Sequence, residues 1–372
     1  MRKETRKREW THFAEPIHAA VGAVQLVPAA DGAVVRPAAN GRPERYRDSV
    51  PTPRRPSAMP SRPYTRTSKN VRRVLLATAT CLLTAPLFAG CEQRRAAEAI
   101  FVGKQFQLSR DIPYDTGERH TLDVYRPRDV SDKPVPVVVF LYGGRWQAGS
   151  KDEYKLAGDA ITRRGYVAVI PDYRLAPQVK FPAWIDDAAH ALRWVHDSIA
   201  HYGGDTTQIY VVGHSAGAHT ATVLSLDDHY LLRAGVQPEF VRGYVSMAGP
   251  VDTVWTDPDV QELMGPREGW PGTYPAQLVS STRHQPLLLL HGLKDNTVLP
   301  PNSTELAALI QKFGGRACAT LYPNLTHISI VVAFMIPRLP IAKVMDDVQA
   351  FVRNPTLSPC GAGGSVTPPI TP

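Results

Sequence analysis

The stretch Ile209-Tyr210-Val211-Val212-Gly213-His214-Ser215-Ala216-Gly217 joins an apolar run to the pattern G-x-S-x-G. The apolar run predicts a buried strand. The small residues around Ser215 allow a sharp turn from that strand into a helix, which holds the serine hydroxyl clear of its own backbone. Glycine, serine and alanine are common residues, so the pattern alone is only a hypothesis of a nucleophilic serine. Three further segments of the chain support it.

Two residues downstream can activate the serine. A hydroxyl needs a base to take its proton and a third group to hold that base, and in this arrangement the acid precedes the histidine along the chain. Asp295 follows the apolar run 286–290, and active-site residues of parallel sheets gather beyond the carboxyl ends of strands. His327 is the one histidine after residue 291, and it reads as part of a loop. We predict Ser215, Asp295 and His327 as the catalytic residues.

A fourth segment can supply backbone donors to an oxyanion. The apolar run 135–141 predicts a strand buried on both faces, and it ends in Tyr142-Gly143-Gly144-Arg145-Trp146. Attack on a carbonyl places negative charge on its oxygen, and each N–H group aimed there is worth about 10²–10³ in rate. We predict that Gly143, Gly144 and Ala216 form the oxyanion hole. Ala216 is included because it directly follows the serine.

In these segments, the chain from about residue 122 to 351 resembles the α/β-hydrolase superfamily, specifically carboxylesterase-like members with an H-G-G-x-W oxyanion loop. The matching segments are 122–125, 143–146, 172–177, 203–205 and 213–219. Within the superfamily, the chain is most similar to bacterial feruloyl-esterase-like hydrolases and to prenylcysteine methylesterase-like carboxylesterases. It departs from the pattern at Tyr142, which stands where the family has a histidine that braces the loop.

The resemblance implies a serine hydrolase that acts on carboxylic esters through an acyl-enzyme intermediate. No separate lid domain of the kind that lipases use is evident in the sequence, which favours small soluble esters as substrates. An exopeptidase or amidase could use the same three residues, and some α/β-hydrolase folds are inactive binding modules. Those inactive modules normally lose a triad residue, whereas this chain keeps all three candidates. No phosphate loop, zinc signature or dinucleotide fingerprint occurs in the sequence, so we expect neither a cofactor nor a metal site.

The order of predicted elements indicates the fold class. Strands are expected at 166–170, 241–247, 286–290 and 317–323, and helices from Pro182 onward, at 215–226 and at 305–313. Alternation of strands and helices predicts an α/β protein with a mostly parallel, doubly wound sheet and helices on both faces.

Two tryptophans are candidates for substrate contact. Residues 250–284 form a connection too long to be a simple turn, and such loops are usually functional. We expect its aromatic residues, Trp270 in particular, to line the pocket, although some could pack a small core of their own. Trp146, at the end of the oxyanion motif, is expected to bind substrate as well. His214 and His219, on either side of the serine, are expected to pack or form hydrogen bonds.

Charge and composition set the first 90 residues apart. They hold 16 Lys/Arg and 6 Asp/Glu, while the remainder holds 26 and 28, so the net charge of +8 comes from the leader. A basic leader gives no reason to expect nucleic-acid binding. Arg72-Arg73, the apolar stretch 74–88 and Ala89-Gly90-Cys91 resemble a lipoprotein signal peptide. The alternatives are ordinary cleavage near Ala89, giving a soluble secreted protein, or an uncleaved anchor.

The chain is therefore divided by prediction as follows. We expect 1–58 to be disordered and to come from an over-extended gene model, with translation starting at Met59. We expect 59–90 to be the signal peptide, 91–106 a linker, 107–353 the catalytic domain and 354–372 a flexible tail. Lipid on Cys91 would anchor an exported protein in a bacterial cell envelope. Cys318 and Cys360 could form a disulfide or remain two thiols, and the sequence does not indicate an oligomeric state.

Overall fold

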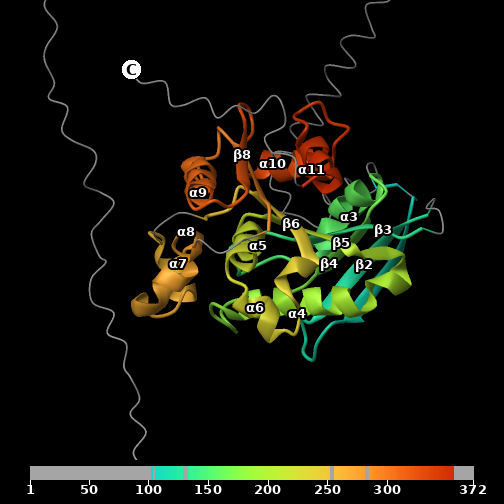
Figure 1. The fold of residues 1–372 in the computed structure, drawn as a ribbon, viewed down its shortest axis with the longest axis horizontal. Coiled ribbons are helices and arrows are strands. Elements are labelled where there is room, and N and C mark those ends of the chain that lie inside the picture. The colour runs from blue at the N-terminus through green and yellow to red at the C-terminus, as the bar shows by residue number, and fades with distance from the viewer. Residues whose placement is uncertain (1–101, 104, 129–132, 252–254, 281–284, 356–372) are drawn as a thin grey trace, which may run out of the picture. The chain divides into compact units, whose positions relative to one another are not determined.

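The structure is a computed structural model, and it describes residues 102–103, 105–128, 133–251, 255–280 and 285–355 (Figure 1). The predicted leader, signal peptide and lipidation site at Cys91 lie outside these residues, as does Cys360. Cys318 is buried and takes part in a disulfide. Among the described helices, none has both the length and the apolar character needed to cross a membrane.

One sheet organises the described part of the chain. Its eight strands follow the order β1-β2-β4-β3-β5-β6-β7-β8. The strands are β1 (Phe106–Pro113), β2 (Thr121–Pro127), β3 (Val135–Leu141), β4 (Val167–Pro171), β5 (Gly204–His214), β6 (Val241–Met247), β7 (Leu287–Gly292) and β8 (Ala317–Tyr322). β2 runs antiparallel to β1 and β4, and all other neighbours are parallel. The predicted mostly parallel sheet is confirmed.

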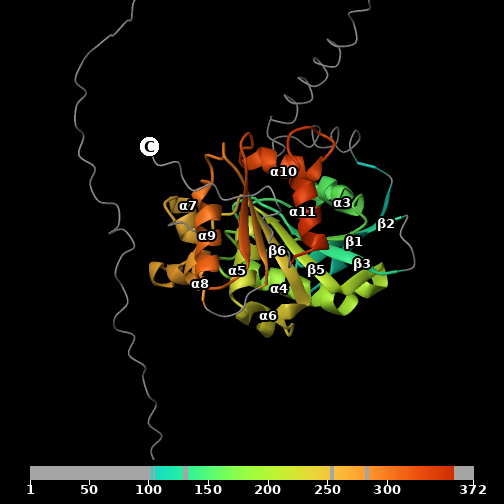
Figure 2. The ribbon, with the colours of Figure 1, turned by 45° about the horizontal axis from the view of Figure 1, so that its top comes forward.

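Helices cover both faces of this sheet. They are α3 (Lys155–Thr162), α4 (Ala183–Ser198), α5 (Ala216–Leu226), α6 (His229–Arg233), α7 (Pro258–Leu263), α8 (Pro275–Leu278), α9 (Pro301–Lys312), α10 (His327–Met335) and α11 (Val344–Arg353). α10 packs against both α3 and α11 on one face, while α4 contacts α5 and α6 on the other (Figures 1 and 2). The sheet is therefore enclosed, which explains why its parallel strands are continuously apolar.

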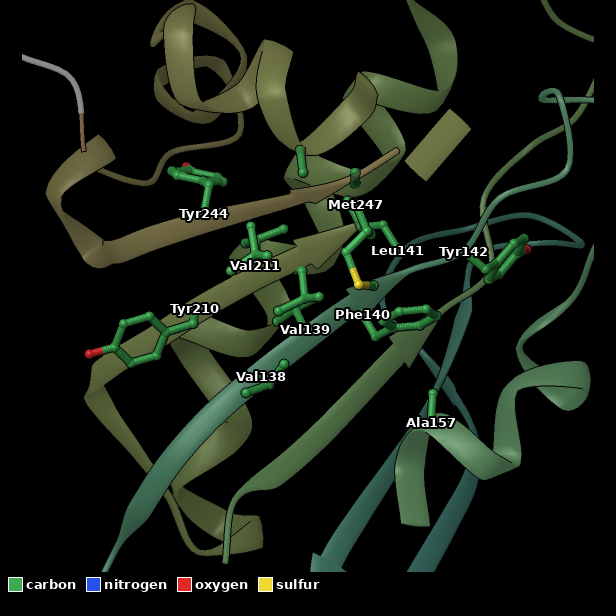
Figure 3. Packing of buried hydrophobic residues seen from close by; sticks show 14 of the residues in the cluster. Val138, Val139, Phe140, Leu141, Tyr142, Ala157, Tyr210, Val211, Tyr244 and Met247 are labelled. Carbon is green, nitrogen blue, oxygen red and sulfur yellow. The ribbon is translucent and has the colours of Figure 1, made fainter. Parts of the chain in front are cut away.

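The core is centred on β3 and its neighbours. Val139 of β3 pairs with Val211 of β5, and both are fully buried (Figure 3). Phe140 points toward the α10 face, where its ring stacks on Phe334 with the ring centroids 5.4 Å apart. Burying a side chain of this size contributes about 1.5–3 kcal/mol. This packing fixes the end of β3 from which the predicted oxyanion loop leaves.

Two predicted loops are helical in the structure. His327 was expected on a loop, but it is the first residue of α10. Thr326 caps that helix, because its backbone N–H donates to Ser329 Oγ (2.7 Å) and its own hydroxyl accepts from the Ser329 N–H (3.3 Å). The connection 250–284 was also expected to be a loop. Its described part folds into α7, the 3₁₀ helix η5 (Arg267–Thr273) and α8.

Candidate active site

Ser215 lies at the sharp turn between β5 and α5, as predicted. Its backbone has φ 53° and ψ −119°, a conformation that costs a non-glycine residue about 1–3 kcal/mol. The turn is tight because a Cβ on Gly213 would lie 2.3 Å from the Gly217 carbonyl oxygen, and one on Gly217 would lie 2.1 Å from that of Leu141. Only glycine fits at either position. The strained turn therefore depends on the two glycines of the G-x-S-x-G pattern.

The structure brings the three predicted catalytic residues together. Ser215 Oγ lies 2.8 Å from His327 Nε2, and His327 Nδ1 lies 2.8 Å from Asp295 Oδ2. Asp295 is 1% exposed and His327 9% exposed, so water has little access to either side chain. The serine hydroxyl is thus hydrogen-bonded to a base that is itself held by a buried carboxylate.

The Asp295 carboxylate is held ionised. Its Oδ1 accepts the backbone N–H groups of Thr297 and Val298, both at 2.9 Å. Burial alone would raise the pKa of Asp295, but hydrogen bonds from His291, His327 and the Val298 backbone outweigh it and hold the pKa below its usual value. His291 was not predicted to contact Asp295, and its place four residues before Asp295 is the only feature of the sequence that indicates the contact.

The histidines on either side of Ser215 form structural hydrogen bonds. His214 Nε2 lies 2.9 Å from the His327 carbonyl oxygen, and burial together with the neighbouring His327 lowers the pKa of His214 to about 3. His219 Nε2 lies 2.8 Å from the Thr273 carbonyl oxygen, and burial lowers the pKa of His219 to about 4. Both rings are therefore neutral donors at pH 7. His214 fixes the backbone of His327, and His219 ties α5 to η5.

Two of the predicted oxyanion residues, Gly143 and Ala216, lie beside the serine. A Cβ on Gly143 would lie 3.0 Å from Ser215 Cβ, and one on Gly144, at φ +135°, would lie 2.1 Å from the Ala148 carbonyl oxygen. Ala216 is the first residue of α5, where backbone N–H groups have no partner within the helix. The backbones of Gly143 and Ala216 thus lie close to Ser215, and Gly144 follows Gly143 on the same loop.

Tyr142 holds the loop that carries the two glycines. Its hydroxyl donates to Asp172 Oδ1 at 2.6 Å and accepts from Arg119 Nη2 at 2.9 Å. The same two partners bind the far end of the loop, since Asp172 Oδ1 accepts the Lys151 N–H at 2.7 Å and Arg119 Nη2 donates to the Gly149 carbonyl at 2.8 Å. The loop 142–151 is therefore closed at both ends by one ion pair. Tyr142 thus occupies a bracing position.

The two tryptophans expected to contact substrate are placed differently. Trp146 is 2% exposed and stacks on Trp184 with a centroid separation of 5.5 Å, so it packs in the core, and its contact with substrate stays a prediction. Arg145 and Trp146 both have a positive φ, which turns the chain here. This turn could not be predicted from the position of Trp146 next to the oxyanion motif. Trp270 is half-buried, and its Nε1 donates to the Gly265 carbonyl at 2.9 Å.

Within the described ranges, no group of three or more His, Cys, Asp or Glu side chains is arranged to hold a metal ion.

The relatives of this chain described next are named as esterases. The rice (Oryza sativa subsp. japonica) protein named "Probable isoprenylcysteine alpha-carbonyl methylesterase ICME" is 28% identical to this chain, over 60% of this chain and 59% of its own length. Esterase LipQ of Mycobacterium tuberculosis is 29% identical, over 71% of this chain and 65% of its own length. The chain thus spans less than two thirds of either relative.

A solved structure supports the same fold. Esterase B from Lactobacillus rhamnosis aligns with a TM-score of 0.61 at 19% identity, covering 77% of this chain and 92% of the esterase. At that identity the likeness shows the fold alone, which is the α/β-hydrolase fold. The family model BD-FAE matches residues 122–310, just over half of the chain. The chain belongs to the BD-FAE family.

Proposed function

We propose that the protein is a serine carboxylesterase that hydrolyses small soluble carboxylic esters through an acyl-enzyme on Ser215. The observation that carries the proposal is the continuous hydrogen-bond chain from Ser215 Oγ through His327 to Asp295, with both distances at 2.8 Å. The strained backbone at Ser215 and the esterase names of the relatives support it as well.

In this mechanism His327 removes the Ser215 proton as the hydroxyl attacks the ester carbonyl. Asp295, held ionised, stabilises the imidazolium that forms. The developing oxyanion is bound by the backbone N–H groups of Gly144 and Ala216, with Gly143 beside them. His327 then protonates the departing alcohol and activates a water molecule that releases the acid. Neutral His214 fixes the His327 backbone and adds no charge that would compete for Asp295.

The test is hydrolysis of p-nitrophenyl acetate and butyrate by the full-length protein and its Ser215→Ala variant. Loss of the nucleophile should reduce kcat on the order of 10⁶-fold. Ser225→Ala is the matched control, because Ser225 lies on the same helix and donates only to the Thr222 carbonyl at 2.8 Å. A Ser215→Ala variant that kept more than about a tenth of the wild-type rate would refute the proposal.

The substrate class needs a panel of compounds. We propose that the segment 255–280, with Trp270, faces the ester and limits its size. Acetyl, butyryl and feruloyl esters should then be better substrates than long-chain acylglycerols above their solubility limit or small amides. Preference for emulsified acylglycerols would overturn the assignment to small soluble esters, and preference for amides would identify an amidase.

We further propose that the protein is exported and anchored to a bacterial membrane through lipid on Cys91. The support is the sequence alone, namely Arg72-Arg73, the apolar stretch 74–88 and the small residues before Cys91. Expression with labelled palmitate in a bacterial host should label the wild-type protein and leave Cys91→Ser unlabelled. Cys81→Ser is the control, because that cysteine would leave with the signal peptide. Unlabelled wild-type protein in the culture medium would indicate a soluble secreted form instead.

A further inference from the structure

A second histidine faces the carboxylate of the proposed catalytic acid. His291, in β7, is fully buried. Its Nε2 lies 3.3 Å from Asp295 Oδ2 and 2.9 Å from the Val298 carbonyl oxygen. The same Oδ2 atom lies 2.8 Å from His327 Nδ1. One carboxylate oxygen is thus approached by two imidazole rings, which come from β7 and from α10.

The surroundings of His291 define where its ring carries hydrogen. The Val298 carbonyl can only accept a hydrogen bond, so Nε2 must be the protonated nitrogen. Nδ1 lies 2.7 Å from Ser303 Oγ of α9, whose hydroxyl can donate to it. The ring is therefore satisfied as a neutral imidazole. In that form its single N–H is shared between the Val298 carbonyl at 2.9 Å and Asp295 Oδ2 at 3.3 Å, and no second positive charge is placed beside His327.

His291 also closes the loop that carries the acid. Asp295 Oδ1 accepts the N–H of Val298 at 2.9 Å, and His291 Nε2 binds the carbonyl of the same residue. Both main-chain polar groups of Val298 are thus used to hold Asp295 at one place. Since Ser303 holds the far side of the ring, β7 and α9 together fix the direction in which the carboxylate points.

We propose that His291 is a positioning residue for Asp295, and that its Nε2–H sets how strongly the carboxylate stabilises a proton on His327. The inference rests on the proposed function, in which Asp295 and His327 act as acid and base. A donor that shares the carboxylate charge reduces its attraction for the imidazolium. Removing that donor should move the pH dependence of catalysis to higher pH.

Three other groups lie near Asp295 and His327 and could influence the pH dependence of catalysis. The His214 ring centroid lies 5.1 Å from that of His327, but burial lowers the pKa of His214 to about 3, so its ring is neutral near pH 7. Ser215 Oγ is uncharged at these pH values. Lys294, the neighbour of Asp295 in sequence, is exposed to solvent, which screens its charge.

The test compares full-length wild-type protein with His291→Leu and His291→Gln. The assay is kcat/KM for p-nitrophenyl acetate from pH 4 to 9. Leucine has a similar volume but no donor, so kcat/KM should fall by roughly tenfold and the acid limb should move up by about half a pH unit or more. Glutamine restores an N–H donor and should return the limb to within about 0.2 unit of the wild type.

His219→Leu is the matched control. It removes another buried histidine, close to Ser215 in sequence, whose ring binds the Thr273 carbonyl and not Asp295. Its acid limb should stay at the wild-type position even if its rate changes. An unmoved limb in folded His291→Leu, or equal shifts in His291→Leu and His219→Leu, would overturn the proposal.

Two further measurements keep the outcome decisive. If His291→Leu does not fold, side-chain ¹⁵N NMR of the wild-type protein decides, because the proposal requires a neutral His291 with hydrogen on Nε2 at pH 7. Hydrogen on Nδ1 alone would overturn it. Ser215→Ala separates the two levels of inference. Activity retained in that variant refutes the esterase mechanism, whereas its loss together with an unmoved His291→Leu limb refutes only the role of His291.

Discussion

Replacing Tyr142 by phenylalanine removes one hydroxyl from the network that closes the loop 142–151. That hydroxyl donates to Asp172 Oδ1 at 2.6 Å and accepts from Arg119 Nη2 at 2.9 Å. The ring itself stays stacked between Tyr154 and Tyr173, with centroid separations of 5.2 and 4.6 Å. The change therefore isolates two hydrogen bonds to charged groups and leaves the packing intact.

The expected loss of folding stability depends on the hydrogen bonds that Asp172 keeps in the phenylalanine variant. Asp172 keeps the Lys151 N–H at 2.7 Å, so it does not become an unpaired charge. A hydrogen bond to a charged group contributes about 1.5–3 kcal/mol, and we expect the free energy of unfolding to fall by about 2–3 kcal/mol. For a domain of this size the melting temperature should fall by about 4–12 °C.

The loss should depend on pH. Burial raises the pKa of Asp172 in the folded protein, and the bond from Tyr142 acts against that rise. A carboxyl whose pKa is raised in the folded protein destabilises the folded state increasingly as the pH rises from its unfolded pKa to its folded pKa, and not below the unfolded pKa. The phenylalanine variant lacks the opposing bond, so its deficit should be larger at pH 7 than at pH 4, where Asp172 is closer to being protonated.

The measurements are urea and thermal unfolding at both pH values, together with kcat for p-nitrophenyl acetate. We expect kcat to fall more than KM changes, because the loop carries Gly143 and Gly144. Tyr166→Phe is the matched control, since the buried Tyr166 hydroxyl has no hydrogen-bond partner in the described structure. A Tyr142→Phe variant within about 0.5 kcal/mol of wild-type stability at pH 7 would show that the network does not hold the loop.

Two other predictions concern the centre of the site. Gly143→Ala should reduce kcat by about 100-fold or more, because the added methyl group would lie 3.0 Å from Ser215 Cβ and 3.1 Å from His214 Nδ1. Gly269→Ala, whose methyl group meets nothing within 4 Å, is its control, and a wild-type kcat for Gly143→Ala would contradict the placement. The pKa of Asp295 is lower in the folded protein than in the unfolded chain, where it is about 4. The ionised carboxylate therefore stabilises the fold above pH 4, and this contribution is lost as the pH falls from the unfolded pKa toward the folded pKa. Urea unfolding from pH 3 to 7 should therefore show wild-type and Asp295→Asn stabilities converging toward acid, and a constant difference would count against this.

The sequence predicted the parts of the site that depend on local patterns. Ser215 was found because a strand and two glycines surround it, and Asp295 because it follows an apolar run. His291 was missed because its place four residues before Asp295 does not by itself indicate a contact. The partners of Tyr142 were missed because Arg119 and Asp172 come from distant segments and meet only in the folded sheet. The packing of Trp146 on Trp184 was not predicted, because chain adjacency does not give the direction in which a side chain points.

The helical segments that were missed have a different cause. α7 and α8 span six and four residues, too short for an apolar period to be recognised. α10 is apolar on nearly all sides, so it lacks the polar face that marks a helix in sequence. Its start was encoded in Thr326 and Ser329, a cap without the more usual Glu or Gln.

His219 binds the main-chain carbonyl of residue 273, and not a side chain. Any amino acid at position 273 presents that carbonyl, so this hydrogen bond to α5 can be retained when side chains of the segment 255–280 change. Libraries that diversify 255–280, or grafts of the corresponding segment from a relative, can therefore explore new specificities as long as the grafted backbone passes within reach of His219.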